Sequence, residues 1–154
     1  MKKRRLIIIT IISAVLFVCI MFLVIFGNPI ILKNRYDFGH AVKNLSTETI
    51  TLNEITSFEW DIVYSFAPYT PKQEMEKIIG FKSNYITETV SEGMLQLIFV
   101  KDNKVVCNIL GYSSNLGYSI SLWTGAEDYC QIRYEDDISF SVEYEDNVPL
   151  LVRN

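Results

Sequence analysis

The sequence contains one histidine, His40, and its three cysteines form no Cys-x-x-Cys pair. Zinc sites take most of their ligands from these two residue types, so a zinc centre is not expected. A hydrolytic triad needs a nucleophile beside a base and an orienting acid, and no serine or cysteine motif accompanies His40. We interpret His40 as a surface or helix-packing residue and predict a protein that is not an enzyme.

Glycine-rich phosphate loops are also absent, and the stretch nearest to G-x-S-x-G, at 111–115, ends in asparagine. The aspartate spacing of an EF-hand calcium loop is missing. We therefore predict no catalytic, metal-binding or cofactor-binding residues, and no cofactor. All 18 acidic residues follow residue 32, whereas four of the 14 basic residues lie within 2–5. An acidic domain does not neutralise phosphates, so nucleic acid is not an expected partner.

What the sequence does contain is a long apolar run over residues 6–26, LIIITIISAVLFVCIMFLVIF, without a charged residue. As an α-helix this stretch would be about 31 Å long, close to the ~30 Å hydrocarbon core of a bilayer. Its hydroxyl residues, Thr10 and Ser13, can bond back to helix carbonyls. We predict a transmembrane helix over 6–26, preceded by a cytoplasmic tail at 1–5.

The basic residues around this run predict its orientation. The segment MKKRR precedes the run, whereas only Lys33 and Arg35 follow it closely. The positive-inside rule then places the N-terminus in the cytoplasm. We expect a membrane-exit linker at 27–35 and an extracytoplasmic domain at 36–154. The protein would be a single-pass, signal-anchored protein of a bacterial cell membrane, and a tail of five residues is too short to carry a function of its own.

Two other interpretations of the N-terminus remain open. A cleaved signal peptide also begins with basic residues, but its apolar core is usually shorter and ends in small residues, and here Ala14 is the only alanine of the run. A lipoprotein would be acylated on Cys19. The residue before such a cysteine is normally small, and Val18 is not.

The sequence of residues 36–154 predicts an α+β domain with a mainly antiparallel sheet, covered on one face by one or two helices. Alternating side chains predict a strand over 58–66. Thr70 as N-cap, Gln73 three positions later and Gly80 as the stop predict a helix over 71–79. The remaining elements expected are a helix at 36–44, a hairpin of 94–100 with 104–110, and strands at 118–122, 130–134, 138–144 and 148–152.

Two groups of side chains are candidates for special roles. Cys107 and Cys130 both fall in the inward register of predicted strands and could form a disulfide in an oxidising compartment, or remain buried thiols. Acidic residues offer a possible binding surface, which solvation alone would also explain. Its members are Glu59, Asp61, Glu135, Asp136, Asp137, Glu143, Glu145 and Asp146.

One segment, FEWDIVYSFAPYTP at 58–71, resembles a recurrent F-x-W-D-x-x-Y-x-F-x-P-Y-T stretch of small membrane-anchored or lipid-anchored bacterial proteins of unassigned role. The matching residues are Phe58, Trp60, Asp61, Tyr64, Phe66, Pro68, Tyr69 and Thr70. The resemblance covers roughly residues 58–80. It implies a shared strand–turn–helix unit and no activity.

These observations give three functional hypotheses. The first is an anchored outer domain that binds another envelope component without catalysis. The second is an immunity-type protein whose acidic C-terminal region blocks a cationic bacteriocin or toxin at the membrane. The third is an envelope enzyme that uses the carboxylates of Glu59 and Asp61, for instance in glycoside cleavage.

Overall fold

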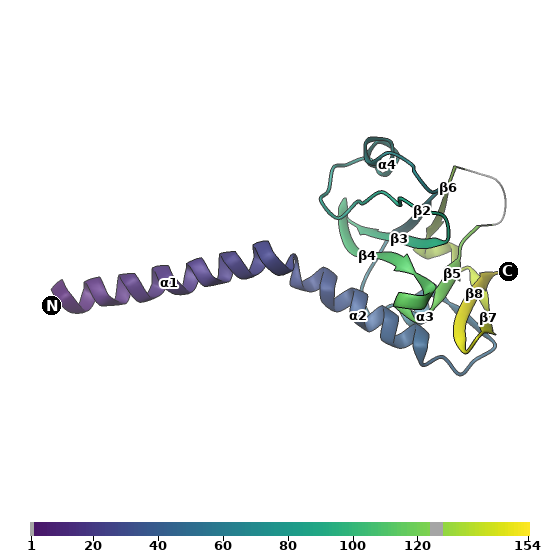
Figure 1. Ribbon diagram of the computed structural model, residues 1–154, viewed down its shortest axis with the longest axis horizontal. Coiled ribbons are helices and arrows are strands. Elements are labelled where there is room, and N and C mark those ends of the chain that lie inside the picture. The colour runs from purple at the N-terminus through teal and green to yellow at the C-terminus, as the bar shows by residue number, and fades with distance from the viewer. Residues whose placement is uncertain (1, 124–127) are drawn as a thin grey trace.

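The computed structural model describes residues 2–123 and 128–154 and consists of a long projecting helix joined to an α+β domain (Figure 1). The projecting helix, α1, spans Lys2–Phe26. Its stretch Lys3–Met21 has a mean hydropathy of 2.3 and is not buried against the rest of the chain. This helix is long and apolar enough to cross a membrane, a test that an N-terminal signal sequence also passes.

The second helix, α2 (Pro29–Lys43), begins seven residues before the predicted helix at 36–44. Gly27 breaks α1 with a φ of 76°. The Asn28 side chain then accepts a hydrogen bond from the Ile30 N–H at 2.9 Å, and proline follows at the first helical position. The stretch 27–35, predicted as a linker, therefore contains the first turns of α2.

The strands form two four-stranded sheets rather than the single sheet expected. One sheet has the order β1-β7-β8-β5 and the other the order β4-β3-β2-β6. The strand pairs are antiparallel except β5 with β8, which is parallel. This pairing confirms the predicted α+β class with mainly antiparallel strands. The strand bounds are β1 Thr49–Thr51, β2 Ile62–Phe66, β3 Met94–Lys101, β4 Lys104–Tyr112, β5 Ser119–Ser121, β6 Tyr129–Arg133, β7 Ser139–Glu145 and β8 Val148–Arg153.

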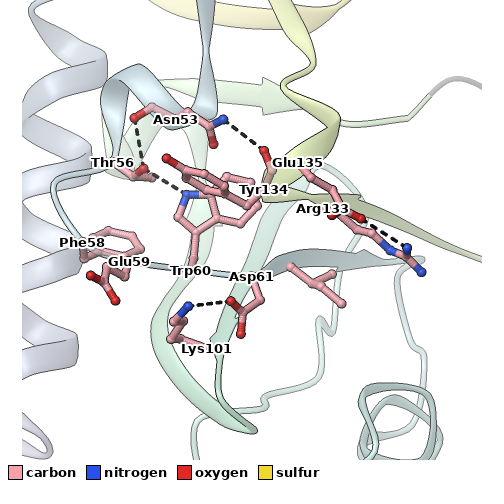
Figure 2. Close-up of a pocket in the computed structure, with 11 residues that line it drawn as sticks. Asn53, Thr56, Phe58, Glu59, Trp60, Asp61, Lys101, Arg133, Tyr134 and Glu135 are labelled. Carbon is pink, nitrogen blue, oxygen red and sulfur yellow. Dashed lines mark hydrogen bonds and ion pairs between the residues drawn. The ribbon is translucent and has the colours of Figure 1, made fainter.

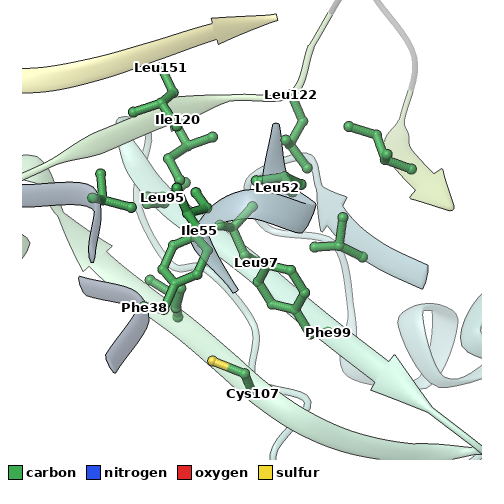
Figure 3. Close-up of a cluster of buried hydrophobic side chains, with 14 of the residues drawn as sticks. Phe38, Leu52, Ile55, Leu95, Leu97, Phe99, Cys107, Ile120, Leu122 and Leu151 are labelled. Atoms are coloured by element: carbon green, nitrogen blue, oxygen red, sulfur yellow. The ribbon is translucent and has the colours of Figure 1, made fainter. Parts of the chain in front are cut away.

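The larger hydrophobic core lies between the two sheets and is closed by α2 and the short helix α3 (Leu52–Ile55) (Figure 3). Phe99 of β3 is fully buried there, with its ring 5.4 Å from the rings of both Phe38 and Phe58. A second core covers the opposite face of β3 and β2 and packs under α4 (Lys72–Ile79). Strand β3 is therefore buried on both faces, in agreement with its apolar residues on each face.

The hairpin predicted at 94–110 is confirmed. Strands β3 and β4 are joined by Asp102 and Asn103, whose φ angles of 47° and 56° are those of a two-residue turn with both central residues left-handed. Strand β4 continues to Tyr112, where the short helix α5 (Ser113–Leu116) begins. On the outer edge of β4, Asn34 of α2 donates to the Val106 carbonyl at 2.9 Å. Arg35 donates to the Asn108 carbonyl at 2.8 Å. These contacts occupy an edge that would otherwise be open to strand pairing.

The predicted strand at 58–66 is wrong in its first half. The regular strand β2 starts at Ile62, and the chain bends over 58–61. Phe58 and Trp60 consequently join the core between the sheets, whereas Tyr64 and Phe66 join the core under α4. The alternating pattern is real, but the bend sends its two halves to opposite faces of the sheet.

The start of α4 also differs from the predicted capping box. Pro71 is the N-cap and makes no side-chain capping bond, and the Lys72 N–H in the first turn donates to the Glu88 carboxylate at 2.6 Å. The Thr70 hydroxyl instead donates to the Ala67 carbonyl at 2.7 Å, within the preceding turn. Gly80 ends the helix with a φ of 94°, as predicted, and Met75 and Ile79 supply its buried stripe.

Of the two alternatives left open for Cys107 and Cys130, the structure has the buried thiols, and the two residues are not bridged to each other. Cys107 lies on β4 and Cys130 on β6, the two edge strands of one sheet. Three strand spacings of roughly 4.8 Å separate these edges, whereas the Cα atoms of a disulfide lie within about 7 Å. The inward register of the two cysteines did not predict this distance, because the distance depends on the order of the strands in the sheet.

We expect the thiols of Cys107 and Cys130 to resist maleimide in the folded chain and to react after denaturation without reductant. Burial raises the pKa of the Cys107 thiol to about 12, so little thiolate is present at neutral pH. Mass spectrometry of a Cys19→Ser chain, labelled with and without denaturant, measures this. A denatured chain that reacts only after reduction would contradict the structure.

Candidate functional site

A cleft of about 710 Å³ opens where the bend at 58–61 meets α3, the end of β3 and the chain after β6 (Figure 2). Three of the predicted surface carboxylates line it, namely Glu59, Asp61 and Glu135. Between them lie two cations that the sequence did not single out, Lys101 and Arg133. The cleft therefore combines charges of both signs with aromatic rings.

Trp60 forms the aromatic part of the cleft. Its side chain is only 3% exposed, and its ring packs edge-on against Phe99 at 5.5 Å and Tyr134 at 5.3 Å. The indole N–H donates to the Thr56 hydroxyl at 3.0 Å, so the polar end of the buried ring is satisfied. Tyr134 is half exposed, and it presents an aromatic surface that solutes can reach.

Asn53 of α3 joins the two sides of the cleft. Its amide nitrogen donates to the Tyr134 carbonyl at 3.0 Å and to a carboxylate oxygen of Asp137 at 2.8 Å. Its amide oxygen is buried and accepts no hydrogen bond from the described residues. A buried acceptor without a donor is costly, so this oxygen favours a ligand or water that brings an N–H or O–H group.

Asp61 holds the bend in place through its side chain and its backbone. Its carboxylate accepts from the Lys101 ammonium at 2.8 Å and from the Asp102 N–H at 2.9 Å. Its own N–H donates to the Val100 carbonyl at 2.7 Å, and its carbonyl accepts from the Tyr134 N–H at 2.8 Å. The hydrogen bonds from Lys101 and Asp102 hold the pKa of the Asp61 carboxyl below its ordinary value. The hydrogen bond to Asp61 also raises the pKa of the Lys101 ammonium.

The charges of the cleft are largely paired with one another. Asp61 pairs with Lys101, and Arg133 approaches Glu135 at 3.5 Å. Glu59 is exposed and forms no ion pair within the described part of the chain. With one carboxylate left over, the cleft has a net negative charge. This favours a ligand with a cationic or N–H-rich group over an anionic one.

The structure separates the remaining predicted carboxylates. Asp136 and Asp137 adjoin the cleft but serve the local fold, because Asp136 accepts from the Arg133 N–H at 2.8 Å and Asp137 accepts from Asn53. The other three lie on the last part of β7 and in the turn that follows it, roughly 13–23 Å along the strand direction from Ser139. These are Glu143, Glu145 and Asp146. The acidic residues therefore form two groups.

Sequence reasoning missed Asn53, Lys101, Arg133 and Tyr134 as cleft residues. The Lys101–Asp61 contact joins residues 40 positions apart, and the Asn53–Tyr134 contact joins residues 81 apart. No local pattern marks such pairs. His40 is exposed on α2, with its ring stacked on Tyr36 at 6.1 Å and outside the cleft.

Comparison with known proteins found no match among protein families, curated proteins or solved structures. Within residues 2–123 and 128–154, no group of three or more His, Cys, Asp or Glu side chains could hold a metal ion. The cleft presents aromatic surface, two ion pairs and a buried acceptor without a donor among the described residues.

We expect the Asp61–Lys101 contact to make stability pH-dependent. Because the pKa of Asp61 is lowered in the folded chain, its contribution is present at neutral pH and is lost as the pH falls below about 4. Asp61→Asn should lower the midpoint of urea unfolding at neutral pH. The midpoint of this variant should then fall less than that of the wild type as the pH is lowered.

The matched control is Glu143→Gln, which removes one exposed carboxylate from β7. It should leave both the midpoint and its pH dependence close to those of the wild type. An Asp61→Asn chain that loses stability in acid as steeply as the wild type would show that the ion pair does not act as described.

Proposed function

We propose that this protein is a single-pass membrane protein whose outer α+β domain binds another envelope component, without catalysis, through the cleft around Trp60. The span would be residues 6–26, with the N-terminus in the cytoplasm. The observation that carries the proposal is the pairing of an exposed apolar helix with a cleft in which Asn53 keeps a buried acceptor open.

The anchor is supported by the surroundings of α1. From Ile7 to Met21 its large apolar side chains are exposed, and each is more than two-fifths accessible. A soluble protein rarely exposes an apolar surface of this extent. The basic residues at 2–5 against Lys33 and Arg35 support a cytoplasmic N-terminus.

The binding role is supported by the composition of the cleft. Tyr134 and Phe58 supply aromatic surface, Asn53 supplies an acceptor, and Glu59 supplies an unpaired negative charge. Peptide N–H groups and a basic side chain satisfy these features together. A polypeptide segment of an envelope protein therefore fits the cleft best. The immunity hypothesis relies on the acidic C-terminal region, whose carboxylates lie in two separate groups, and it stays a prediction.

We expect the C-terminus, after Asn154, to lie outside the cytoplasm. A reporter that works only outside the cytoplasm should therefore be active when it is fused there, and one that works only inside should be inactive. The reason is that the uncharged stretch over 6–26 stops in the bilayer while MKKRR stays inside. An alkaline phosphatase fusion should be active and a fluorescent-protein fusion dark. The reverse pattern, or a mature chain in the medium without its first thirty residues, would contradict the anchored orientation.

We expect a photo-reactive amino acid at Glu135, on the rim of the cleft, to give a discrete cross-linked product in intact cells. Glu59→Lys should reduce that product several-fold, because it reverses the unpaired charge of the cleft. Glu143→Lys makes the same charge change on β7 and should have no effect. Equal loss in both variants, or no product at Glu135, would argue against the cleft as the binding site.

A further inference from the structure

A second surface lies where the projecting helix joins the domain. Figure 1 shows α1 leaving the domain beside the start of β4 and the loop that follows α4. Residues 28, 30, 31, 81–83, 85 and 103–106 line a groove of about 340 Å³ at this junction. The groove is separate from the cleft around Trp60, and the two share no lining residue.

Hydrogen bonds fix the groove to the first residues after α1. The Asn28 N–H donates to the Tyr85 hydroxyl at 2.8 Å, and the Asn108 side chain donates to the Tyr85 carbonyl at 3.0 Å. Asn108 is in turn bonded to Arg35 of α2. The loop carrying Tyr85, the strand β4 and the start of α2 are therefore held together as one face.

The depth of this face follows from the position of Asn28. It lies two residues beyond Phe26, where α1 ends, so the Tyr85 hydroxyl that Asn28 contacts lies within about 10 Å of that end. The headgroup layer on each side of a bilayer is about 5–7 Å thick. If 6–26 spans the hydrocarbon core, the Tyr85 hydroxyl lies in the headgroup layer or just beyond it, the region where tyrosine is enriched in membrane proteins.

The side chains of the face suit that environment. Ile30 is 63% exposed, and Phe81 is partly exposed while it packs against the core under α4. Lys82 and Lys104 are exposed and form no ion pair among the residues described. The described lining of the groove contains no carboxylate. Lysines beside apolar and aromatic side chains are typical of surfaces that contact anionic lipid.

The far end of the domain has the opposite charge. Tyr144 of β7 donates to the carbonyl of Leu45, just beyond the end of α2. Helix α2 has 15 residues and is about 22 Å long, so the β7–β8 turn lies well away from the groove. The last part of β7 and that turn carry Glu143, Glu145 and Asp146, which an anionic membrane would repel.

We propose that the face formed by Ile30, Phe81, Lys82, Tyr85 and Lys104, here called the collar, rests on the lipid headgroups of the leaflet from which α1 emerges. Lys82 and Lys104 bind lipid phosphates, and the acidic β7–β8 turn points away from the membrane. The collar thereby sets the orientation of the domain on the membrane. The inference depends on the proposed function only through the membrane anchor. The lipid surface is the one binding partner proposed for the collar.

The test uses the full chain with Cys19→Ser, reconstituted into phosphatidylcholine vesicles with and without phosphatidylglycerol. A fluorophore is attached at Asn84→Cys, beside the collar, or at Glu145→Cys, in the far turn; Cys107 and Cys130 are buried. Lipids with a quencher at headgroup level should quench the Asn84 label several-fold more than the Glu145 label. Phosphatidylglycerol should increase this difference.

Lys104→Glu should reduce the phosphatidylglycerol-dependent quenching of the Asn84 label at least two-fold. Lys43→Glu makes the same charge change on the exposed end of α2, away from the collar, and should leave it unchanged. Equal quenching at Asn84 and Glu145, or equal effects of the two substitutions, would overturn the collar. So would an emission change at Asn84 that inorganic phosphate alone produces in detergent, because it indicates a phosphate site rather than a membrane surface.

Flotation of the same samples separates the two proposals. A chain that does not float with vesicles contradicts the membrane anchor, and with it the collar. A chain that floats while its Asn84 label remains unquenched keeps the anchor and contradicts the collar alone.

Discussion

Asp61 is bonded through both its carboxylate and its peptide group, and the arrangement of the cleft depends on these contacts. The carboxylate holds the β3–β4 turn through Lys101 and Asp102, while the backbone bonds to Val100 and Tyr134. Segments far apart in sequence thus meet at one residue. The bend it fixes turns Trp60 into the core and leaves Glu59 exposed at the rim. Without it, the alternating segment would be free to continue as a strand, and the cleft would lose one side.

Strand β3 of the sheet that carries this bend is buried on both faces. Phe99 and Leu97 of β3 face the other sheet, whereas Ile98 and Val100 face α4. Such a strand gains stability from two cores at once, which suits it to hold the β3–β4 turn rigidly. The cleft and the collar both border this turn, at Lys101 and Lys104 respectively. One rigid hairpin therefore positions both surfaces.

Local sequence signals predicted the elements whose causes are local. The hairpin at 94–110 and the helix stop at Gly80 are predicted correctly because each needs only residues that tolerate positive φ. The predictions that were wrong needed information from elsewhere in the chain. The break before Ile62 depends on Asp61 meeting Lys101, and Cys107 and Cys130 are apart because β3 and β2 lie between them. Periodicity reports which side chains alternate, but not which strand lies beside which.

The placement of charge along the chain has a physical consequence for an anchored domain. A single helix leaves the domain free to tilt on the membrane unless something else restrains it. The Asn28–Tyr85 hydrogen bond restrains the junction from the protein side, because it ties the first residue after Gly27 to a loop of the domain. Lysines at this junction and carboxylates at the β7–β8 turn would add a torque in an anionic bilayer's field, attracting one end and repelling the other. The cleft borders the same hairpin turn as the collar, so a domain held in this way would offer its binding site to partners near the membrane rather than to the open solvent.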